Sequence, residues 1–259
     1  MIIYKGVSTD SLPGVTANLI DWSTLGGLSV ETIASPGVDG RVVVGSSQDE
    51  TEFDIYVLVR GSSPEEALER ASHFAAFVDP ARGTGLLNPT GLDGAASYPN
   101  AVVTDMSVWK RHTWDAGNGY QLRATVTFAA DPHGRPPVDP SFTRSGAGTL
   151  AFTVEAGDTR CYPTVEVRGT LAAEQTVRFV LGDYACTITG PLTSAQVLRL
   201  DFENFEFAVW AGTTKAASVV TRMSSLDRLE LWPDTAYSLA VTTTGSVDSV
   251  TVIPNSRTL

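Results

Sequence analysis

The sequence predicts a mainly β protein in which an α+β region with one helix precedes an all-β region. Three observations support this fold class. The 259 residues include 23 Gly and 14 Pro, a composition rich in turns. Short segments that alternate apolar and polar residues, typical of half-buried strands, recur along the chain. Only residues 63–78 repeat apolar side chains at the three- to four-residue spacing of an amphipathic helix.

Four strands are expected before this helix. Residues 1–6 form a short apolar segment that ends at a glycine, and residues 28–33 alternate apolar and polar side chains. Residues 41–44 and 52–60 complete the set, after a turn-forming stretch at 35–40. The segment 52–60 gives the clearest pattern, because every second residue is large and apolar. One face of this strand is therefore predicted to carry Phe53, Ile55, Val57 and Val59.

The helix has a well-defined start and stop in the sequence. Ser63 is a favourable N-cap, Pro64 suits the first helical position, and Glu66 completes a capping box. The pair Asp79-Pro80 ends the helix, because a residue before proline avoids the helical conformation. We expect one helix of about four turns that packs against a sheet. Its predicted apolar face consists of Ala67, Ala71, Phe74, Ala75 and Val78.

Two further strands and a break follow the helix. Strands are expected at 101–110 and 120–129, with residues 115–119 as the loop of a hairpin. The chain then becomes dense in Pro and Gly, which is typical of a domain boundary. We therefore predict a first domain at 1–138, a linker at 139–148 and a second domain at 149–259.

The second region is predicted to be a β-sandwich without helices. Its segments alternate at intervals of about 8–12 residues, separated by turns such as Gly182-Asp183 and Glu203-Asn204. The expected strands are 149–155, 163–168, 176–181, 184–189, 196–202, 205–210, 227–231, 236–242 and 247–253.

Composition and charge exclude several classes of protein. A hydrophobic content of 42% favours a folded chain, and no apolar run approaches the length of a membrane span, so no membrane association is expected. The first residues lack the basic and apolar regions of a signal peptide. The net charge is −11, with a basic deficit in both halves, which disfavours tight binding of nucleic acid. Passage of nucleic acid without binding stays open.

Cysteine and histidine residues give no sign of a metal site. Cys161 and Cys186 fall on neighbouring predicted strands and either pair or remain two buried thiols, as expected in a reducing cytosol. The three histidines, His73, His112 and His133, lack the spacing of metal ligands and are interpreted as surface or half-buried side chains. We predict no metal.

Two short motifs resemble catalytic or cofactor-binding signatures. Ser107 and Lys110 have Ser-X-X-Lys spacing, but on a predicted strand they point to opposite faces, which separates the two groups. The segment Gly146-Ala147-Gly148 resembles the start of a dinucleotide loop but precedes a strand instead of a helix. We therefore expect no cofactor and no catalytic residues at either motif.

Acidic and aromatic residues of the second region are weaker candidates. Asp201, Glu203 and Glu206 are the best candidates for paired carboxylates of a glycosidase, although the solvent face of a hairpin explains them fully. Trp210 and Trp232 either stack on sugar rings or belong to the core.

The order of features resembles the N-terminal domain of siphophage distal tail proteins. The resemblance begins with an opening strand and the turn 36–40, where Val38 replaces the usual Arg or Asn of the family. It continues through the strand 53–59 and a Ser-Pro-Glu-Glu helix that ends Phe77-Val78-Asp79-Pro80, and it closes on 128–132. The second region is similar to the family's galectin-like or carbohydrate-module-like sandwich. The residues that carry this likeness are 161–169 and the hairpin 198–210.

This resemblance implies a structural role in the virion. Distal tail proteins form a six-fold ring that joins the tail tube to the tail-tip hub, with the second domains displayed outwards. The expected partners are further copies of the chain, the tail tube protein, the tape-measure protein and the hub protein, with DNA passing through the lumen. Folding in the bacterial cytoplasm and residence at the tail tip follow. The candidate ring-contact turn consists of Pro36, Gly37, Asp39 and Gly40.

Two other functions remain open at this stage. The sandwich is a candidate carbohydrate-binding module for the host cell surface, either alone or within a ring. A wall-degrading enzyme is the third hypothesis and has the least support, since no catalytic constellation is present in the sequence.

Overall fold

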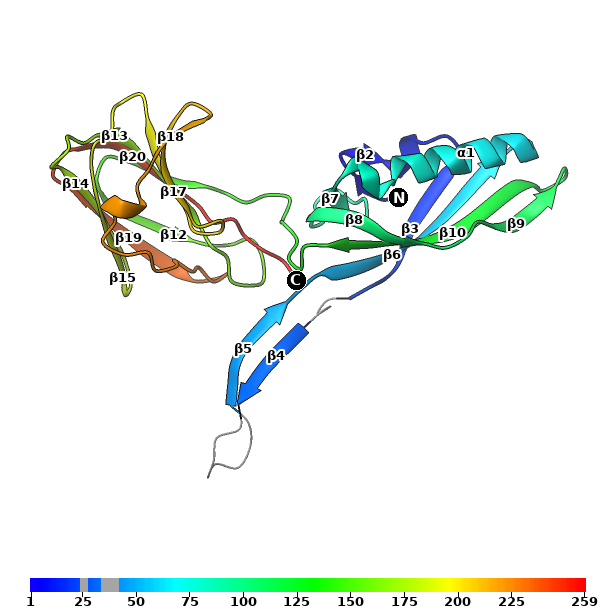
Figure 1. The fold of residues 1–259 in the computed structure, drawn as a ribbon, viewed down its shortest axis with the longest axis horizontal. Coiled ribbons are helices and arrows are strands. Elements are labelled where there is room, and N and C mark those ends of the chain that lie inside the picture. The colour runs from blue at the N-terminus through cyan, green and yellow to red at the C-terminus, as the bar shows by residue number, and fades with distance from the viewer. Residues whose placement is uncertain (24–27, 34–41) are drawn as a thin grey trace. The chain divides into compact units, whose positions relative to one another are not determined.

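The computed structural model describes residues 1–23, 28–33 and 42–259, which divide into two compact units. The first unit comprises Met1–Pro137 with Leu259, and the second comprises Val138–Thr258. Strands dominate both units, and one α-helix occurs among the described residues (Figure 1). The predicted mainly β fold class is confirmed.

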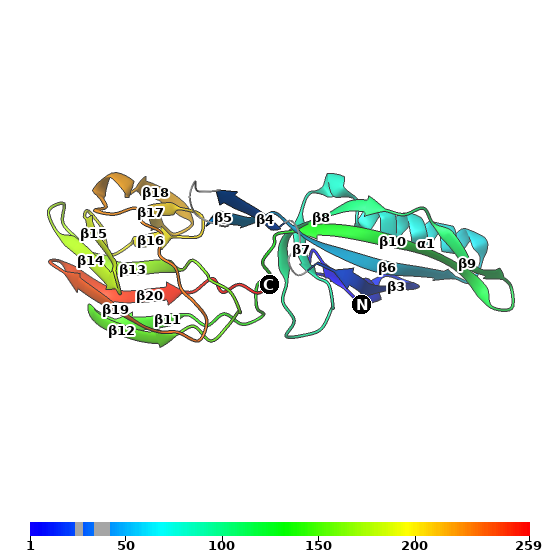
Figure 2. The same cartoon turned by 90° about the horizontal axis from the view of Figure 1, so that it is seen from below.

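The first unit contains an eight-stranded sheet, a two-stranded sheet and helix α1. The large sheet has the order β2-β1-β7-β8-β10-β6-β3, and β9 pairs with the first part of β10. Figures 1 and 2 show β8, β10, β6 and β3 side by side. The elements are β1 (Ile3–Tyr4), β2 (Val7–Ser8), β3 (Val15–Trp22), β4 (Leu28–Ile33), β5 (Val42–Gln48), β6 (Thr51–Gly61), α1 (Pro64–Phe77), β7 (Gly85–Asn88), β8 (Tyr98–Met106), β9 (Lys110–Asp115) and β10 (Gly119–Ala130), with short 3₁₀ turns at Thr9–Ser11 and Pro80–Arg82.

Helix α1 packs on one face of the large sheet, over β6 and β10 (Figure 1). The alternation in β6 buries its odd-numbered apolar residues against the helix, where the buried Ala67, Ala71 and Phe74 meet them. The predicted N-cap is confirmed, because the Ser63 hydroxyl accepts a hydrogen bond from the Glu66 backbone nitrogen at 3.2 Å. The capping pattern in the sequence therefore places the helix correctly.

The large sheet curls so that its two ends approach each other. The Met1 nitrogen, just before β1, donates hydrogen bonds to the Ala17 carbonyl on β3 and, at 3.2 Å, to the Asn18 side chain. Tyr4 of β1 is fully buried, with its ring edge-on to Phe128 of β10. The core of this unit thus lies between the curled sheet and α1.

The strand predicted at 101–110 is wrong at its second end, because β8 stops at Met106 and β9 begins at Lys110. At Ser107, a side-chain hydrogen bond takes the place of one of the regular backbone hydrogen bonds to β10. The Ser107 backbone nitrogen donates to the Thr125 carbonyl, while its hydroxyl accepts from the Thr125 nitrogen at 2.9 Å. This side-chain contact ends the strand and turns the chain towards β9.

The second unit is built from a six-stranded sheet and a four-stranded sheet. Their orders are β11-β20-β13-β16-β17-β18 and β12-β19-β14-β15. Apolar side chains from both sheets form one buried cluster, as in a β-sandwich. The strands are β11 (Phe142–Ser145), β12 (Gly148–Thr153), β13 (Thr164–Thr170), β14 (Thr176–Leu181), β15 (Tyr184–Thr189), β16 (Val197–Asp201), β17 (Glu206–Ala211), β18 (Thr214–Ser218), β19 (Ala236–Thr243) and β20 (Ser246–Ile253), with a 3₁₀ turn at Val220–Arg222.

The sequence analysis missed two strands in this region and predicted one that does not form. Residues 142–145, which fall in the predicted linker, form β11 and pair with β20. Residues 214–218 form the edge strand β18, whose exposed residues show no apolar alternation. Residues 227–231 alternate but make only a single bridge, between Leu231 and Cys161, because their apolar side chains fill the core without a paired neighbouring strand.

The two cysteines are separate, buried thiols. Cys161 forms the isolated bridge with Leu231, and Cys186 lies on β15 in the four-stranded sheet. Both side chains belong to the apolar core. Of the two alternatives that the sequence left open, the structure supports two buried thiols that form no disulfide.

Candidate functional surfaces

The face of the large sheet that α1 does not cover is the most distinctive surface of the first unit. Because side chains alternate along a strand, the even-numbered residues of β6 lie on this open face. On the neighbouring β10, the odd-numbered residues share it, as the register Asp54–Thr127 shows. Most of these positions carry charged or hydroxyl side chains, with the buried Leu58 on β6 as an apolar exception, so this face is more polar than the opposite one.

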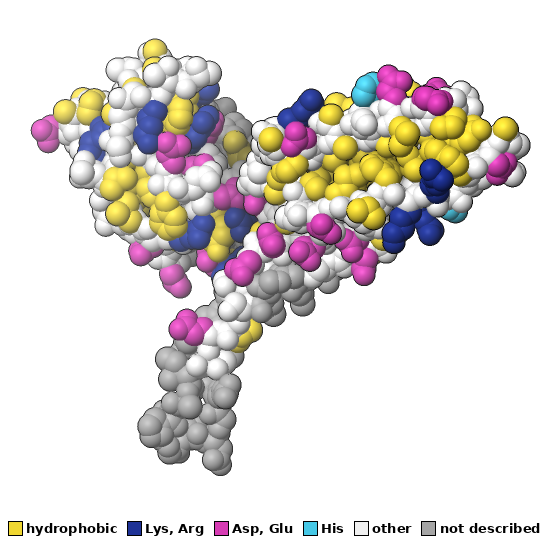
Figure 3. Space-filling model, turned by 45° about the vertical axis from the view of Figure 1, so that its right-hand side comes forward, with side chains coloured by type: hydrophobic (Ala, Val, Ile, Leu, Met, Phe, Trp, Pro, Cys, Tyr) yellow, Lys and Arg dark blue, Asp and Glu magenta, His cyan; other side chains and the backbone are white. Residues whose placement is uncertain are grey.

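Acidic side chains gather at one end of the open face. On β10, Thr127 lies opposite Asp105 of β8 on one side and opposite Asp54 of β6 on the other. Asp54 in turn lies opposite Asp21 of β3. Glu52 precedes Asp54 on the same face. We call Asp21, Glu52, Asp54 and Asp105 the acidic row. Figure 3 shows acidic side chains aligned along one border of this unit.

A shallow hollow of about 150 Å³ opens within the acidic row, at the β3 edge of the sheet. Its lining includes Asp21, Glu52 and Asp54 together with Trp22, whose side chain is 53% exposed. Ile20, which forms a bulge in β3, is 56% exposed at the same edge. Large apolar side chains in water beside unpaired strand backbone are typical of a surface that another chain covers.

A second hollow on the open face is basic. It has a volume of about 230 Å³, and Lys110 and Arg123 line it together with Tyr56, Ser107, Ala124 and Thr125. The prediction that Ser107 and Lys110 are separated on opposite faces is therefore wrong. Because Ser107 lies in the turn between β8 and β9, strand alternation does not apply across the motif.

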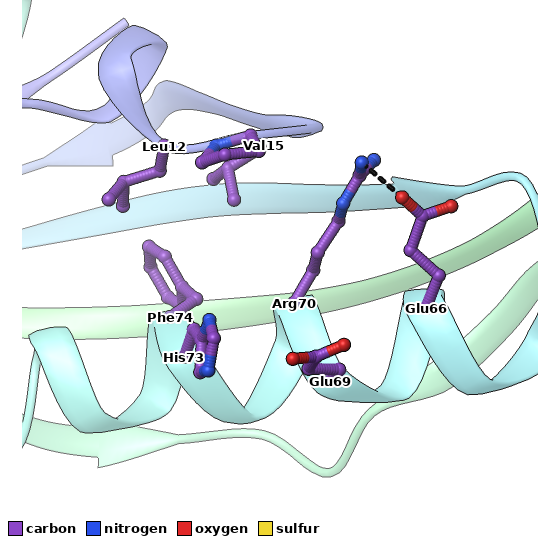
Figure 4. Close-up of a pocket in the computed structure, with 8 residues that line it drawn as sticks. Leu12, Val15, Glu66, Glu69, Arg70, His73 and Phe74 are labelled. Atoms are coloured by element: carbon purple, nitrogen blue, oxygen red, sulfur yellow. Dashed lines mark hydrogen bonds and ion pairs between the residues drawn. The ribbon is translucent and has the colours of Figure 1, made fainter.

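A third hollow of about 250 Å³ lies between α1 and the start of β3 (Figure 4). Leu12, Val15 and Phe74 form its apolar wall, and His73 comes to it from the helix. Arg70 pairs with Glu66 at its far end and also donates to the Arg60 carbonyl at 2.6 Å. These contacts fix the helix against β6 and the start of β3. We therefore interpret their role as structural.

The carboxylate of Glu66 is stabilised in its charged form. It accepts hydrogen bonds from the Ser62 hydroxyl at 2.5 Å and the Ser62 backbone nitrogen at 2.6 Å. These bonds, together with the Arg70 charge, hold the pKa of Glu66 below its ordinary value. The Glu66 side chain therefore satisfies a backbone donor just before the helix, one residue earlier than in a standard capping box.

The three candidate carboxylates of the second unit are each engaged separately. Asp201 accepts the backbone hydrogen bonds of the turn after β16, at 3.0 and 2.9 Å. Glu203 pairs with Arg257, and Glu206 pairs with Lys215, both at 2.7 Å. Asp201 and Glu206 do face each other across the β16–β17 hairpin. The arrangement accords with the interpretation that the hairpin fold explains these residues.

Two tryptophans of the second unit have different environments. Trp232 is 52% exposed, while Trp210 is half-buried on β17 under the Arg199 guanidinium, which lies 5.2 Å from the ring centre. Arg199 in turn pairs with Glu166 at 2.8 Å. Trp232 is thus the more exposed of the two, and neither belongs to the buried cluster of the sandwich.

One sequence-predicted site lies outside the part of the chain that the structure describes. The candidate ring-contact turn of Pro36, Gly37, Asp39 and Gly40 lies outside the described residues. Within residues 1–23, 28–33 and 42–259, no three His, Cys, Asp or Glu side chains are grouped as metal ligands. In the same ranges, no helix is long and apolar enough to cross a membrane.

The acidic row and the basic hollow were not recognised from the sequence. Glu52 and Asp54 stand on the polar side of the clearest predicted strand, and that alternation was a usable signal. Asp21 and Asp105 join them only through the pairing of β3 and β8 with the central strands. This pairing depends on registers that no local pattern specifies.

Comparisons with known proteins identify the fold. No protein-family model matches the sequence, and no curated protein matches it significantly. Among solved structures, the chain is similar to the Dit protein (gp 19.1) of phage SPP1, described as a paradigm of the hub adsorption apparatus in phages that infect Gram-positive hosts. The identity is 15%, with 97% of this chain and 96% of that chain covered, and the TM-score is 0.65. A chain of the phage P2 baseplate in its activated conformation with Ca matches at 12% identity, with the same coverages and a TM-score of 0.43.

The first of these likenesses shows that this chain has the fold of the SPP1 Dit protein across both units. It confirms, at the level of fold, the resemblance to distal tail proteins that the sequence features indicated. A shared fold at low identity constrains function less tightly than shared residues do.

Proposed function

We propose that this chain is a structural protein of a phage tail tip, a distal tail protein that forms a six-fold ring between the tail tube and the tail-tip hub. The observation that carries this proposal is the fold shared with the SPP1 Dit hub protein over 97% of the chain. Because the match extends over both units, it supports a role for the chain as a whole and not for one module.

The sheet edges of the first unit supply the ring contacts in this proposal. The edge strand β3 carries the exposed Ile20 and Trp22, and β9 is an edge on the other side of β10. Contact between β3 of one copy and β9 of the next is heterologous, so repetition closes into a ring when the rotation is sixty degrees. In this proposal, backbone groups at both edges provide the hydrogen bonds for the contact, apart from the Ala17 carbonyl on β3, which already accepts a hydrogen bond from Met1.

The open face lines the lumen of the ring in this proposal, with α1 on the outside. Six copies then place six acidic rows around the channel. In this proposal the fixed negative charges of these rows repel DNA phosphates while the genome passes. The basic hollow lies on the same face, so each copy also presents the cations Lys110 and Arg123 beside its acidic row. The chain's net charge of −11 is compatible with this role.

The other partners follow from the position of such a ring in the virion. One surface of the ring stacks on the tail tube protein, the other contacts the hub protein, and the tape-measure protein lies at the lumen. The chain folds in the cytoplasm of the bacterial host and resides at the tail tip. It acts by assembly, without a cofactor or a catalytic step.

Paired cysteines test the ring contact directly. The double variant Ile20→Cys with His112→Cys places one thiol at each proposed edge, and the pair Asn18→Cys with His112→Cys covers a shifted register. Native Cys161 and Cys186 are buried and do not compete. On oxidation we expect a ladder of cross-linked species that ends at six. Single variants are the control, and monomers from both double variants would refute the β3–β9 contact.

A second function of the sandwich remains a candidate because of one observation. The half-exposed ring of Trp232 in the second unit offers an open face for stacking on a sugar. In this alternative, the unit binds host-surface carbohydrate within the ring. A glycan array with the full chain and with Trp232→Ala tests it. Binding that disappears in the variant would support carbohydrate recognition, and no binding by the wild-type chain would refute it.

A further inference from the structure

The basic hollow on the open face is built by four strand positions that face one another. Lys110 on β9 lies directly opposite Arg123 on β10, and Thr125, two residues further along β10, lies directly opposite Tyr56 on β6. Positions two apart on a strand share a face, so all four side chains border the same space. Ser107, at the turn before β9, closes the hollow.

Two cations face each other here, and neither forms an ion pair within the described part of the chain. Like charges directly opposite in an antiparallel pair destabilise it. Among the ion pairs of the described residues, none involves Lys110 or Arg123, and both side chains are exposed. A third cation, Arg60, lies opposite Gln121 on the same face. The chain thus maintains a positive site although its net charge is −11.

Hydroxyl groups complete the set of donors around the hollow. The Ser107 oxygen already accepts the Thr125 backbone N–H at 2.9 Å, so its own proton is directed elsewhere. Tyr56 and Thr125 add two more hydroxyls at the rim. Asp54, the carboxylate next along β6, accepts a hydrogen bond from Thr127 at 2.6 Å and lies beyond Tyr56. Donors therefore outnumber acceptors in this space.

We infer that the hollow is a binding site for a phosphate group, held between Lys110 and Arg123 with Tyr56, Ser107 and Thr125 as hydroxyl donors. A phosphate has three or four acceptor oxygens, which matches two cationic side chains and three hydroxyls better than the two oxygens of a carboxylate. The volume of about 230 Å³ suits a small anionic group and is below that of a drug-sized ligand site. The site lies within one chain and does not depend on the proposed ring.

Binding of phosphate between Lys110 and Arg123 can be tested through the stability of the folded chain. Thermal melting of the full chain is measured in sodium phosphate and in sodium acetate at equal ionic strength and pH. We expect phosphate to raise the melting temperature of the wild-type chain relative to acetate, because a ligand bound only to the folded state stabilises it. Equal melting temperatures in the two salts would overturn the proposal.

Two variants that each remove one positive charge extend this test, so the result does not depend on whether one particular variant folds. In acetate, Lys110→Gln and Arg123→Gln should each melt at or above the wild-type temperature, because the like-charge contact is removed. In calorimetric titrations with phosphate, each variant should bind about tenfold more weakly, since one charge-assisted contact is lost. The matched control is Arg178→Gln, which removes an exposed strand cation in the second unit and should leave phosphate binding unchanged. Phosphate affinity that is unaltered by both test variants would overturn the proposal.

A second ligand distinguishes a free phosphate ion from the phosphodiester of a nucleic acid. A six-nucleotide single-stranded DNA is titrated beside inorganic phosphate. Binding of this oligonucleotide that depends on Lys110 and Arg123 would support a phosphodiester as the ligand. Binding of inorganic phosphate alone, with the same dependence, would support a free phosphate ion. If Arg178→Gln weakens the binding of either ligand as much as Lys110→Gln and Arg123→Gln do, the result would contradict a localised site.

Discussion

Thr127 on β10 donates a hydrogen bond of 2.6 Å to the carboxylate of Asp54 on β6, directly across the ladder. This bond holds Asp54 on the open face, where Asp21 lies opposite it on the other side. Two carboxylates in that relation repel each other and lower the stability of the sheet. A charge arrangement that costs stability fits a functional surface better than a structural one, and it is the basis of the lumen proposal.

Reversal of charge in the acidic row should slow the passage of DNA. In particles that carry Asp54→Lys with Asp105→Lys, each ring subunit presents two cations to the phosphates in place of two anions. We expect genome release to take about twice as long or longer, as measured by the time course of DNA entry into host cells. The control is Asp248→Lys, an exposed acid of the second unit. An unchanged time course in the double variant would contradict the role of the acidic row.

The hydrogen bonds from Ser62 to Glu66 predict a dependence of stability on pH. Because the pKa of Glu66 is lowered in the folded state, its carboxylate contributes stability above its ordinary pKa of about 4.5. This contribution disappears as the pH falls through the lowered pKa. The wild-type chain should therefore be more stable than Glu66→Gln at pH 7 in urea unfolding experiments. This difference should shrink and then vanish as the pH falls through the lowered pKa. Glu65→Gln, in the same helix turn, is the control, and a difference that persists at low pH would contradict this account.

The sequence predicted the elements whose signals are local. The helix was predicted correctly because its start is marked by Ser63, Pro64 and Glu66, which lie within four residues of one another. The strand 52–60 was predicted because it buries one face and exposes the other, which produces strict alternation. In both cases a short stretch of chain carries the whole signal.

Elements whose stability comes from distant pairing were not predicted. Strand β18 is exposed at every position, and its pairing with β17 is what makes it a strand. The segment 227–231 has strand-like alternation but lacks a paired neighbouring strand, so the pattern there reflects core packing. The acidic row and the basic hollow depend on the registers of several strands, and a shift of one residue moves their side chains to the other face.

The contact between α1 and the sheet should depend on Phe74. Its side chain is 1% exposed and lies edge-on to Trp109 at 6.2 Å between ring centres. Phe74→Ala should lower the free energy of unfolding of the first unit by about 3–5 kcal/mol, because it leaves a cavity in the core. Hydrogen exchange of the β6 and β10 amides measures this loss for the unit alone. Leu68→Ala, at a 54% exposed position on the same helix, should leave the protection nearly unchanged. Equal effects of the two substitutions would contradict the packing described above.

The buried thiols predict a slow chemical reactivity. Cys161 and Cys186 are both fully buried in the sandwich core, and neither forms a disulfide. In the folded chain we expect neither thiol to react promptly with a disulfide reagent, and we expect two thiols to react after denaturation. Reducing agent should not change the melting temperature of the second unit. One or no thiol after denaturation without reductant would contradict two free cysteines.

The central claim is that copies of this chain assemble into a six-fold ring. The most direct measurement is the mass of the purified, concentrated protein by light scattering, with negative-stain images of the same peak. The proposal predicts six copies of the 27.5 kDa chain, about 165 kDa, in ring-shaped particles. A monomer at every concentration, with no rings even after incubation with isolated tail tubes, would contradict it.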